Sequence, residues 1–175
     1  MSSLQEAVPS PLSVDPDTAA VSERWLQGFA EGWAKGAGPA AFIAHFRPML
    51  DPDVLLLGPQ LPPLRGLEAF ERRFVAPLFA LMPDVRAVLG ASAVRGETIF
   101  AELTITGTLR GGRRVRLRAF DRIALRDGLA VERETCFDPS PLLAAMALSP
   151  RSWPVFIGLR VRALADLSPA SRRRR

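Results

Sequence analysis

The sequence predicts an α+β fold, in which helices at the start of the chain are followed by a meander of antiparallel strands. Three observations support this prediction. Apolar residues recur at helical spacing in the first third of the chain, and alternating strands separated by glycine turns fill much of residues 85–137. The chain has 175 residues, of which 48% are hydrophobic and 23% charged. This size and composition are typical of one compact domain.

The first predicted helix covers about 18 residues and begins near Asp17 or Thr18, either of which can cap it. Its apolar stripe repeats every four residues, at Val21, Trp25, Phe29 and Trp33. Gly36 and Gly38 are expected to end this helix. A second, short helix is predicted over 39–46, with a proline near its first turn.

The middle of the chain predicts a short strand, a loop and a third helix. The strand covers 54–57 and ends at Gly58-Pro59, and the proline-rich segment 60–65 is expected to be a loop. A third helix follows Gly66, with an apolar face formed by Leu67, Phe70, Phe74, Leu78 and Leu81. Pro77 is expected to kink this helix or end it early.

The second half predicts four strands and more helix. A strand over 85–94 precedes two hairpins. The hairpin strands cover 99–109, 115–125 and 129–137, with turns at Gly111-Gly112 and Arg126-Asp127-Gly128. A helix is expected from Pro139, and one more over 153–167.

The register of the hairpins decides which side chains meet. In the last hairpin, a three-residue loop with Gly128 left-handed pairs Asp121 with Arg133 and Arg122 with Glu132, whereas a two-residue loop would oppose like charges. The three-residue loop is therefore predicted. In the other hairpin, a two- or four-residue loop centred on Gly111-Gly112 places Glu102 opposite Asp121.

These registers predict a mostly apolar sheet face around a small charged cluster. Its members are Glu102, Thr104, Thr106, Leu117, Ala119, Asp121, Ile123, Val131, Arg133, Thr135 and Phe137. The other face is expected to carry an arginine ladder, formed by Arg116, Arg118 and Arg122, against Glu132 and Glu134. A slip of one residue would separate Asp121 from Arg133.

Composition restricts the chemistry and the location. A single cysteine, Cys136, and a single histidine, His45, argue against an internal disulfide and a multi-histidine metal site. No cofactor or metal is expected. The net charge of +5 includes four arginines at 172–175, which are interpreted as a solvated tail without the interleaved aromatics of an RNA-binding surface. No signal peptide or transmembrane segment is evident, so the cytoplasm is the expected location.

Over about residues 18–150, the order of elements resembles the nuclear transport factor 2-like superfamily, and its SnoaL-like branch in particular. The residues that carry the resemblance are Gly58-Pro59, Arg65-Gly66-Leu67-Glu68, Ala119-Phe120-Asp121-Arg122, Arg126-Asp127-Gly128 and Phe137-Asp138-Pro139. The resemblance implies a cone-shaped fold, in which a curved mixed or antiparallel sheet wraps around the N-terminal helices and encloses a pocket. It also implies a homodimer formed through the convex face of the sheet.

The sequence divides into four parts, and the resemblance implies which known chemistries to compare with the central one. The parts are a flexible arm at 1–16, the SnoaL-like domain at 17–150, a helix at 151–167 and a basic tail at 168–175. Asp121 falls where ketosteroid isomerases carry an oxyanion-hole aspartate, but their base falls at Gly58 and their tyrosine near Ala30. The Arg-Asp-Asp set of the epoxide hydrolases falls at Glu102, Thr104 and Thr135. In the SnoaL-like cyclases, an acidic residue acts on an aromatic polyketide, and Asp121 is its counterpart.

The catalytic hypothesis is therefore proton transfer by Asp121 and Glu102 in an apolar pocket, with Arg133 as their electrostatic partner. Two neighbouring carboxylates do not both ionise easily, so one acid and one base are expected at neutral pH. The alternative is a purely structural ion-pair cluster. The pocket is expected to be lined by Trp25, Phe29, Phe70, Phe74, Thr104, Thr106, Thr135 and Phe137, although aromatics at helical spacing also suit a plain core.

Two further roles are weighed against catalysis. The chain could be a non-catalytic module that binds a small apolar molecule or dimerises. The segment from Trp153 to Leu167 could lie on a membrane surface, but Pro154 and Gly158 weaken such a helix and favour packing against the domain. His45 is expected to be exposed or hydrogen-bonded, and Cys136 to point away from the pocket.

Overall fold

The computed structural model describes residues 16–59, 61–149 and 153. The helical elements are α1 (Pro16–Lys35), α2 (Pro39–Phe46), the 3-10 turn η1 (Arg47–Met49), α3 (Leu67–Ala69), the π-helical η2 (Phe70–Val75), α4 (Ala76–Leu81) and α5 (Ser140–Ala147). The strands are β1 (Leu50–Gly58), β2 (Leu61–Arg65), β3 (Arg86–Arg95), β4 (Thr98–Thr108), β5 (Arg114–Arg126) and β6 (Leu129–Phe137). The predicted α+β class and the order of its main elements are confirmed.

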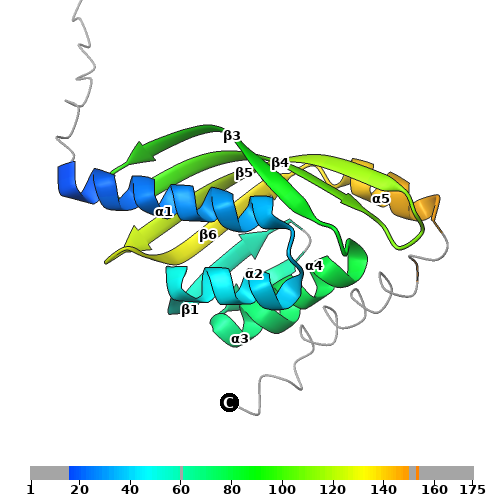
Figure 1. Ribbon diagram of the computed structural model, residues 1–175, viewed down its shortest axis with the longest axis horizontal. Helices are drawn as coiled ribbons and strands as arrows, with labels where there is room; N and C mark the ends of the chain where they lie inside the picture. Colours follow the sequence, from blue (N-terminus) through cyan, green and yellow to red (C-terminus); the bar gives the residue numbers. More distant parts are fainter. Residues whose placement is uncertain (1–15, 60, 150–152, 154–175) are drawn as a thin grey trace, which may run out of the picture.

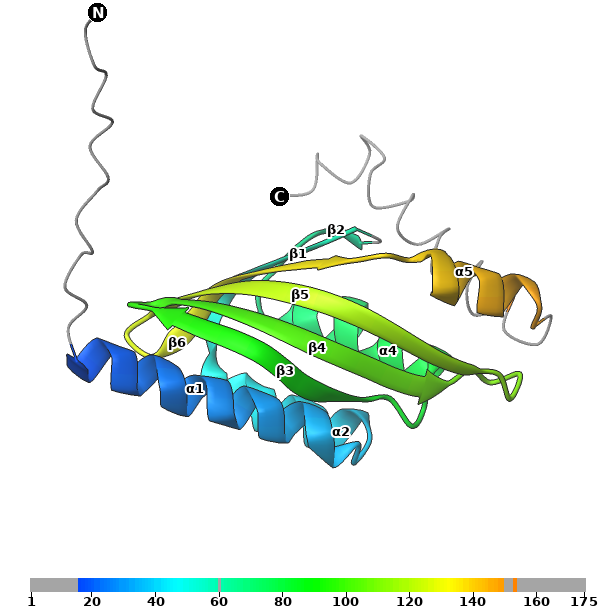
Figure 2. The ribbon, with the colours of Figure 1, turned by 90° about the horizontal axis from the view of Figure 1, so that it is seen from above.

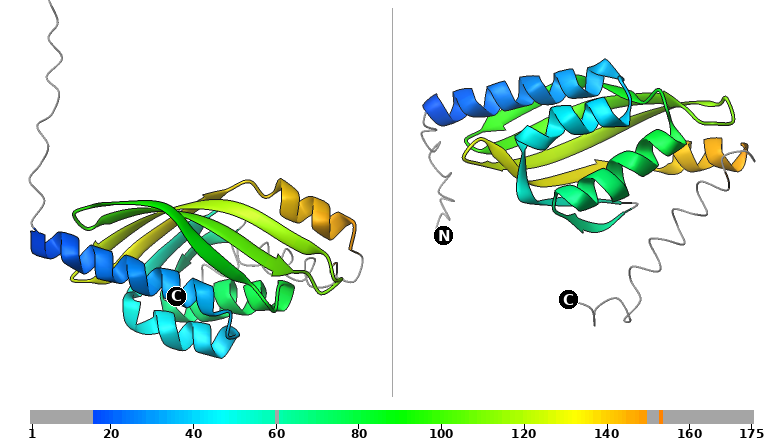
Figure 3. Two further views of the ribbon diagram at one scale, coloured as in Figure 1. Left: turned by 45° about the horizontal axis from the view of Figure 1, so that its top comes forward. Right: turned by 60° about the horizontal axis from the view of Figure 1, so that its bottom comes forward.

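The six strands form one curved sheet that does not close into a barrel. Its order is β2-β1-β6-β5-β4-β3, so β2 and β3 are its edges (Figure 2). The β1–β6 pair is parallel and the other pairs are antiparallel. The helices α1, α2, α3 and α4 cover one face of the sheet, while the other face carries none of them (Figures 1 and 3). We call these the inner and the outer face.

The predicted N-terminal helices are both present, and they pack unusually closely. The left-handed Gly36, with a φ of 56°, follows the last residue of α1, and α2 covers the predicted range. The two helices approach each other at Gly32, where a Cβ atom would lie 2.4 Å from the His45 ring and 2.6 Å from Phe46. The aromatic stripe of α1 enters the core, and Phe29 is 1% exposed.

The segment after β1 corrects one prediction. Residues 61–65 form strand β2 rather than a loop, with Leu64 opposite Leu56 and Arg65 opposite Leu55. Proline has no N–H group to donate, but an edge strand pairs on one side only, so Pro62 and Pro63 are tolerated there. The proline content of this segment favours a loop, because composition alone cannot show that the segment pairs at the edge of a sheet, where proline is tolerated.

Pro77 does not end the third helix. Helical backbone continues from Leu67 through α3, η2 and α4 to Leu81, and the six residues Phe70–Val75 before Pro77 adopt π-helical geometry. A proline in a helix leaves a carbonyl of the preceding turn without a donor and crowds that turn. The wider π turn directly before it accommodates this disruption within a continuous helix.

The last hairpin corrects the predicted register. Asp127 and Gly128 have φ angles of 52° and 77°, so they form the two-residue turn with positive φ at both positions, and Arg126 pairs with Leu129. A bulge after the Leu125–Ala130 pair then shifts the register, so that Asp121 lies opposite Thr135 and Ile123 opposite Arg133. Beyond the bulge the shift from the predicted register is two residues, which keeps Asp121 and Arg133 on their predicted face, whereas beside the turn Ala130 is buried opposite Leu125.

The hairpin between β4 and β5 also corrects the predicted register, and this correction changes which residues of β4 lie on the inner face. Leu109 N–H donates to the Arg113 carbonyl, and the loop between them has three residues and ends in the left-handed Gly112. The predicted loop had an even number of residues. The register therefore differs by one, and Leu103 and Ile105, not Glu102 and Thr104, lie on the inner face with Leu117 and Ala119.

Most of the predictions about the chain ends concern residues that the structure does not describe. Within the predicted arm 1–16, the structure describes Pro16, where α1 begins. Beyond Ser149 it describes Trp153, whose indole N–H donates to the Met146 carbonyl at 3.0 Å. The remainder of the predicted helix 151–167 and the tail 168–175 are not described. In the described part of the chain, no helix is both long enough and apolar enough to cross a membrane.

Candidate functional site

An apolar cavity lies between the inner face of the sheet and α4. Its volume is about 190 Å³. β1 and β6 supply part of the wall, β4 and β5 supply Ile105 and Leu117, and the helical segment 67–81 supplies much of the rest. Its lining includes Trp33, Phe74, Ile105, Leu117, Arg133 and Thr135. The remaining lining side chains are mostly aliphatic, so the cavity suits an apolar occupant.

A buried ion pair stands at this cavity. Arg133 on β6 donates from Nε to Oδ2 of Asp121 on β5 at 2.9 Å, and its Nη2 lies 2.7 Å from the same oxygen. The Arg133 side chain is 10% exposed and that of Asp121 is fully buried. The two residues are diagonal neighbours on adjacent strands, which places their side chains within reach of each other. Arg133 lines the cavity, whereas Asp121 is buried, contacts Arg133 and does not belong to the lining.

Three aromatic rings surround the guanidinium of Arg133. Its Cζ atom lies 5.2 Å from the ring centre of Phe29, 5.5 Å from that of Trp33 and 5.6 Å from that of Phe74. A guanidinium over aromatic faces is attracted by their quadrupoles, and more strongly where water is excluded. The rings and Asp121 together fix the position of Arg133, so the cation is presented in a set orientation.

Two buried polar atoms near the pair have no hydrogen-bond partner among the residues that the structure describes. They are Oδ1 of Asp121 and the indole Nε1 of Trp33. Both Arg133 contacts with Asp121 go to Oδ2, which leaves Oδ1 unengaged. A buried polar atom without a partner is unfavourable and is a point at which a bound molecule can contribute a hydrogen bond.

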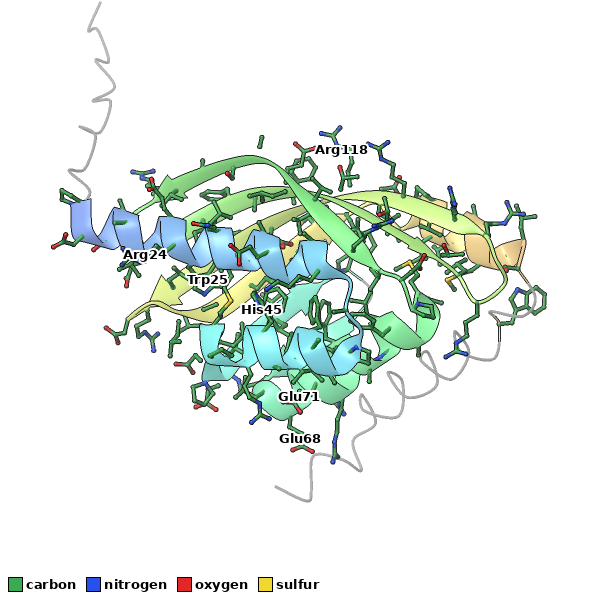
Figure 4. The ribbon with its side chains drawn as sticks, in the orientation of Figure 1. Arg24, Trp25, His45, Glu68, Glu71 and Arg118 are labelled. Carbon is green, nitrogen blue, oxygen red and sulfur yellow. The ribbon has the colours of Figure 1, made fainter. Side chains whose placement is uncertain are left out.

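Glu102 is not part of this site. It lies on the outer face, where its Oε1 accepts from Arg118 Nε at 2.8 Å and lies 2.6 Å from Arg118 Nη2. Figure 4 shows Arg118 on the side of the sheet away from the helices. The predicted pair of Glu102 and Asp121 is therefore wrong, because the one-residue difference in register places the two carboxylates on opposite faces.

The predicted pocket residues divide into three groups. Phe74, Thr135 and Phe137 line the cavity. Trp25, Phe29 and Phe70 are core residues with exposed fractions of 6%, 1% and 3%, and do not belong to its lining. Trp25 donates its indole N–H to the Met49 carbonyl at 3.0 Å, which ties α1 to η1. Thr104 and Thr106 lie on the outer face, for the same reason as Glu102.

The remaining candidates behave as structural residues. His45 Nε2 lies 2.7 Å from the Gly28 carbonyl, so the imidazole links α2 to α1 (Figure 4). Cys136 is exposed on β6. Among the described residues, no group of three or more His, Cys, Asp and Glu side chains is placed to hold a metal ion.

Several lining residues were missed by sequence reasoning, and an available signal could have found one of them, Ile105. Ile99, Ala101, Leu103 and Ile105 alternate with more polar neighbours along β4. Matching this apolar row to Val115, Leu117 and Ala119 on β5 would have given the observed register. Trp33 appeared only as a member of the helical stripe, and nothing local distinguishes a core ring from one that lines a cavity.

Within the described lining, Arg133, Arg73 and the Thr135 hydroxyl are the polar groups of note, and no Asp, Glu or His side chain belongs to it. The arrangement can therefore hold an apolar body and donate hydrogen bonds to one acceptor group. Among the described residues, the carboxylate next to this lining is that of Asp121, which contacts Arg133 but does not itself line the cavity.

Comparison with known proteins identifies the family. Residues 23–133 match the SnoaL-like domain, which is more than half of the chain. No curated protein matches the chain significantly.

Solved structures share the fold. A SnoaL-like polyketide cyclase from Jannaschia sp. CCS1, itself named as putative, is 20% identical with a TM-score of 0.60, over 74% of this chain and 93% of that one. IdmH from Streptomyces antibioticus, which is named as a putative polyketide cyclase, is 21% identical with a TM-score of 0.60, over 72% of this chain and 98% of that one. TerC, co-crystallised with polyporic acid, is 17% identical with a TM-score of 0.63, over 73% and 98%. At these identities, the likeness establishes the fold alone.

Proposed function

The chain belongs to the SnoaL-like domain family, and from that premise we propose that it binds a small, mostly apolar molecule whose one hydrogen-bond-accepting group meets Arg133. The observation that carries this proposal is a fixed, nine-tenths buried guanidinium at the wall of an otherwise apolar cavity. Apolar pockets that contain a few well-placed polar groups are the common form of small-molecule sites.

The cavity limits the size of the ligand. Its volume of about 190 Å³ lies below the roughly 300–1,000 Å³ of sites for drug-sized molecules. The Arg133–Asp121 pair is neutral as a unit, so it requires an acceptor oxygen rather than a full negative charge. The indole N–H of Trp33, which lacks an acceptor among the described residues, is a second donor available to such an oxygen. A compact aromatic ketone, enol or acid fits this description.

The test compares two probes that differ only in the acceptor group, the ketone 2-tetralone and the hydrocarbon tetralin. Isothermal titration should show 2-tetralone binding about tenfold more tightly or better, because hydrogen bonds to a charged donor contribute about 1.5–3 kcal/mol. The double variant Arg133→Met/Asp121→Leu should bind both probes equally. It replaces both charges with apolar groups, so neither is left buried alone.

Neighbouring residues on β4 provide a matched control for the location. Ile105→Phe places extra volume in the cavity and should abolish binding of both probes. Thr104→Phe places the same ring on the outer face and should leave binding unchanged. Equal affinity of the native chain for the two probes, or binding unaffected by Ile105→Phe, would contradict the proposal.

A second candidate function is a cofactor-free isomerisation or cyclisation in the same cavity, with Asp121 as the proton acceptor. It is favoured by the Oδ1 atom of Asp121, which is buried and has no hydrogen-bond partner among the described residues. The names of the structural neighbours, which include polyketide cyclases, are consistent with this candidate. One carboxylate would have to accept and return the proton, because Glu102 lies on the other face.

A further inference from the structure

A polar groove on the outer face, separate from the cavity, is lined by arginines whose side chains make no hydrogen bond or ion pair among the described residues. The groove lies where β3, β4 and β5 run side by side near the β4–β5 hairpin, and its volume is about 410 Å³. Its lining consists of Asp84, Arg86, Thr106, Gly107, Thr108, Arg114, Val115 and Arg116. Three arginines and two threonines thus line one groove.

The strand register builds this groove. Arg86 on β3 pairs with Thr106 on β4, and Thr106 pairs with Arg116 on β5, so the three form one row across the sheet. In the next row, Thr108 lies opposite Arg114. Side chains of one row point to the same face, and residues two apart on a strand do so as well. The arginines therefore project together on either side of the threonine hydroxyls.

Charge pairing distinguishes these arginines from the others on the same face. Arg118 pairs with Glu102, and Arg122 Nη1 donates to Glu132 Oε1 at 2.7 Å. Across the described residues, the side chains of Arg86, Arg114 and Arg116 make no hydrogen bond or ion pair. The outer face is thus neutralised at its centre and positive at this end.

The one carboxylate of the groove lining is already engaged. Asp84 accepts from the Thr108 backbone N–H at 2.6 Å and from the Thr108 hydroxyl at 2.7 Å. These hydrogen bonds are the main cause of a lowered pKa of Asp84, and the charge of Arg86 lowers this pKa further. Three arginines against one ionised aspartate leave two positive charges in excess, which matches a dianion.

We propose that this groove binds a phosphate group. Guanidinium groups recognise phosphate oxygens through paired N–H donors, and three of them with a threonine hydroxyl can contact several oxygens of one phosphate. A single carboxylate would leave most of these donors unused. The site lies on the opposite face of the sheet from the cavity, so it is independent of the ligand proposed there.

The test is titration of the full ¹⁵N-labelled chain with inorganic phosphate, with sodium chloride at matched ionic strength as the reference. The amide signals of Thr106, Thr108 and Arg116 should shift with phosphate and not with chloride. Arg86→Gln/Arg116→Gln should weaken phosphate binding about tenfold or more, since each lost charge-assisted contact has an effect of this order. Arg118→Gln is the matched control on the same strand and face, and should change binding less than twofold.

Asp84→Asn tests the sign of the effect. Removing this negative charge should strengthen phosphate binding several-fold, whereas a merely structural role of Asp84 would weaken it or leave it unchanged. Phosphate shifts spread over the whole surface, or equal losses in the groove double variant and in Arg118→Gln, would overturn the proposal.

Two further probes separate the sources of the phosphate group. Glycerol 3-phosphate binding at the same amides would support a soluble phosphate ester. Co-sedimentation with phosphatidate vesicles that is lost in Arg86→Gln/Arg116→Gln would support a lipid headgroup. Failure of both probes together with inorganic phosphate would reject the site.

Discussion

Burying Arg133 against Asp121 removes two charges from water, and replacing such pairs with apolar residues is often neutral or stabilising. In this chain, the pair also leaves a carboxylate oxygen and a nearby indole N–H without partners among the described residues. A structural role alone would be better served by aliphatic side chains. We therefore infer that the pair is arranged for a bound molecule.

The residue Asp121 separates catalysis from binding. If Asp121 accepts a proton from the ligand, Asp121→Asn should retain binding of 2-tetralone and lose exchange of its α-protons for solvent deuterium, followed by NMR. The substitution also leaves Arg133 with a neutral partner, so the free energy of unfolding should fall by about 3–5 kcal/mol. Urea denaturation measures this loss, and a thermal melt shows the temperature at which the variant is still folded. An absence of exchange in the native chain would leave binding as the function.

Part of the candidate site, the pair of Asp121 and Arg133, could be predicted from the sequence. Asp121 and Arg133 were predicted on one face, and the structure brings them together, because a register error of two residues keeps the alternation. The prediction that Glu102 shares this face is wrong, because a register difference of one residue places its side chain on the opposite face of the sheet. Residue types and parity can thus suggest a cluster, but loop length decides its membership.

The contact between α1 and α2 makes a prediction at the scale of elements. Gly32→Ala should lower the free energy of unfolding by about 1–3 kcal/mol, because its Cβ would lie 2.4 Å from His45 and the neighbouring side chains are packed. Gly28→Ala, one turn earlier on α1, is the matched control. Its Cβ would meet only the flexible end of Met49 at 3.1 Å, and alanine favours helix by about 1 kcal/mol. Chemical denaturation of both variants is the measurement, and equal effects would contradict the close contact.

Element boundaries were more predictable than element partners. The helix at 39–46 and the strand at 129–137 match their predicted bounds, since their apolar periodicity is local. Pairing depends on neighbours that are distant in the chain. The segment 61–65 is a strand because β1 lies beside it, and the helix passes Pro77 because a π turn precedes it. Neither condition is visible in the local sequence.

At the scale of the whole molecule, the outer face leaves large apolar side chains in water. Val88, Phe100 and Phe120 are 66%, 47% and 53% exposed. Exposed apolar groups clustered on one sheet face indicate an interaction surface. We propose that two copies of the chain associate through this face.

Light scattering tests this association. The native chain should have twice the mass of one chain, and Phe100→Ser/Phe120→Ser should have the mass of a single chain with an unchanged circular dichroism spectrum. Leu148→Ser, which replaces another exposed apolar side chain next to α5, is the control and should remain a dimer. A native chain of single mass would refute the proposal.

The parallel contact between β1 and β6 also determines when the domain can be completed during synthesis. Leu50 pairs with Ala130, and Leu57 pairs with Glu134. During synthesis on the ribosome, most of the domain is made between β1 and its neighbour β6, so β1 can pair with β6 only late. In contrast, β4, β5 and β6 are joined by short turns and can pair as they emerge. We expect the meander to form first and β1 with β2 to join it last. Because β1 and β6 both line the cavity, we expect a nascent chain to acquire this cavity only at the final stage of folding.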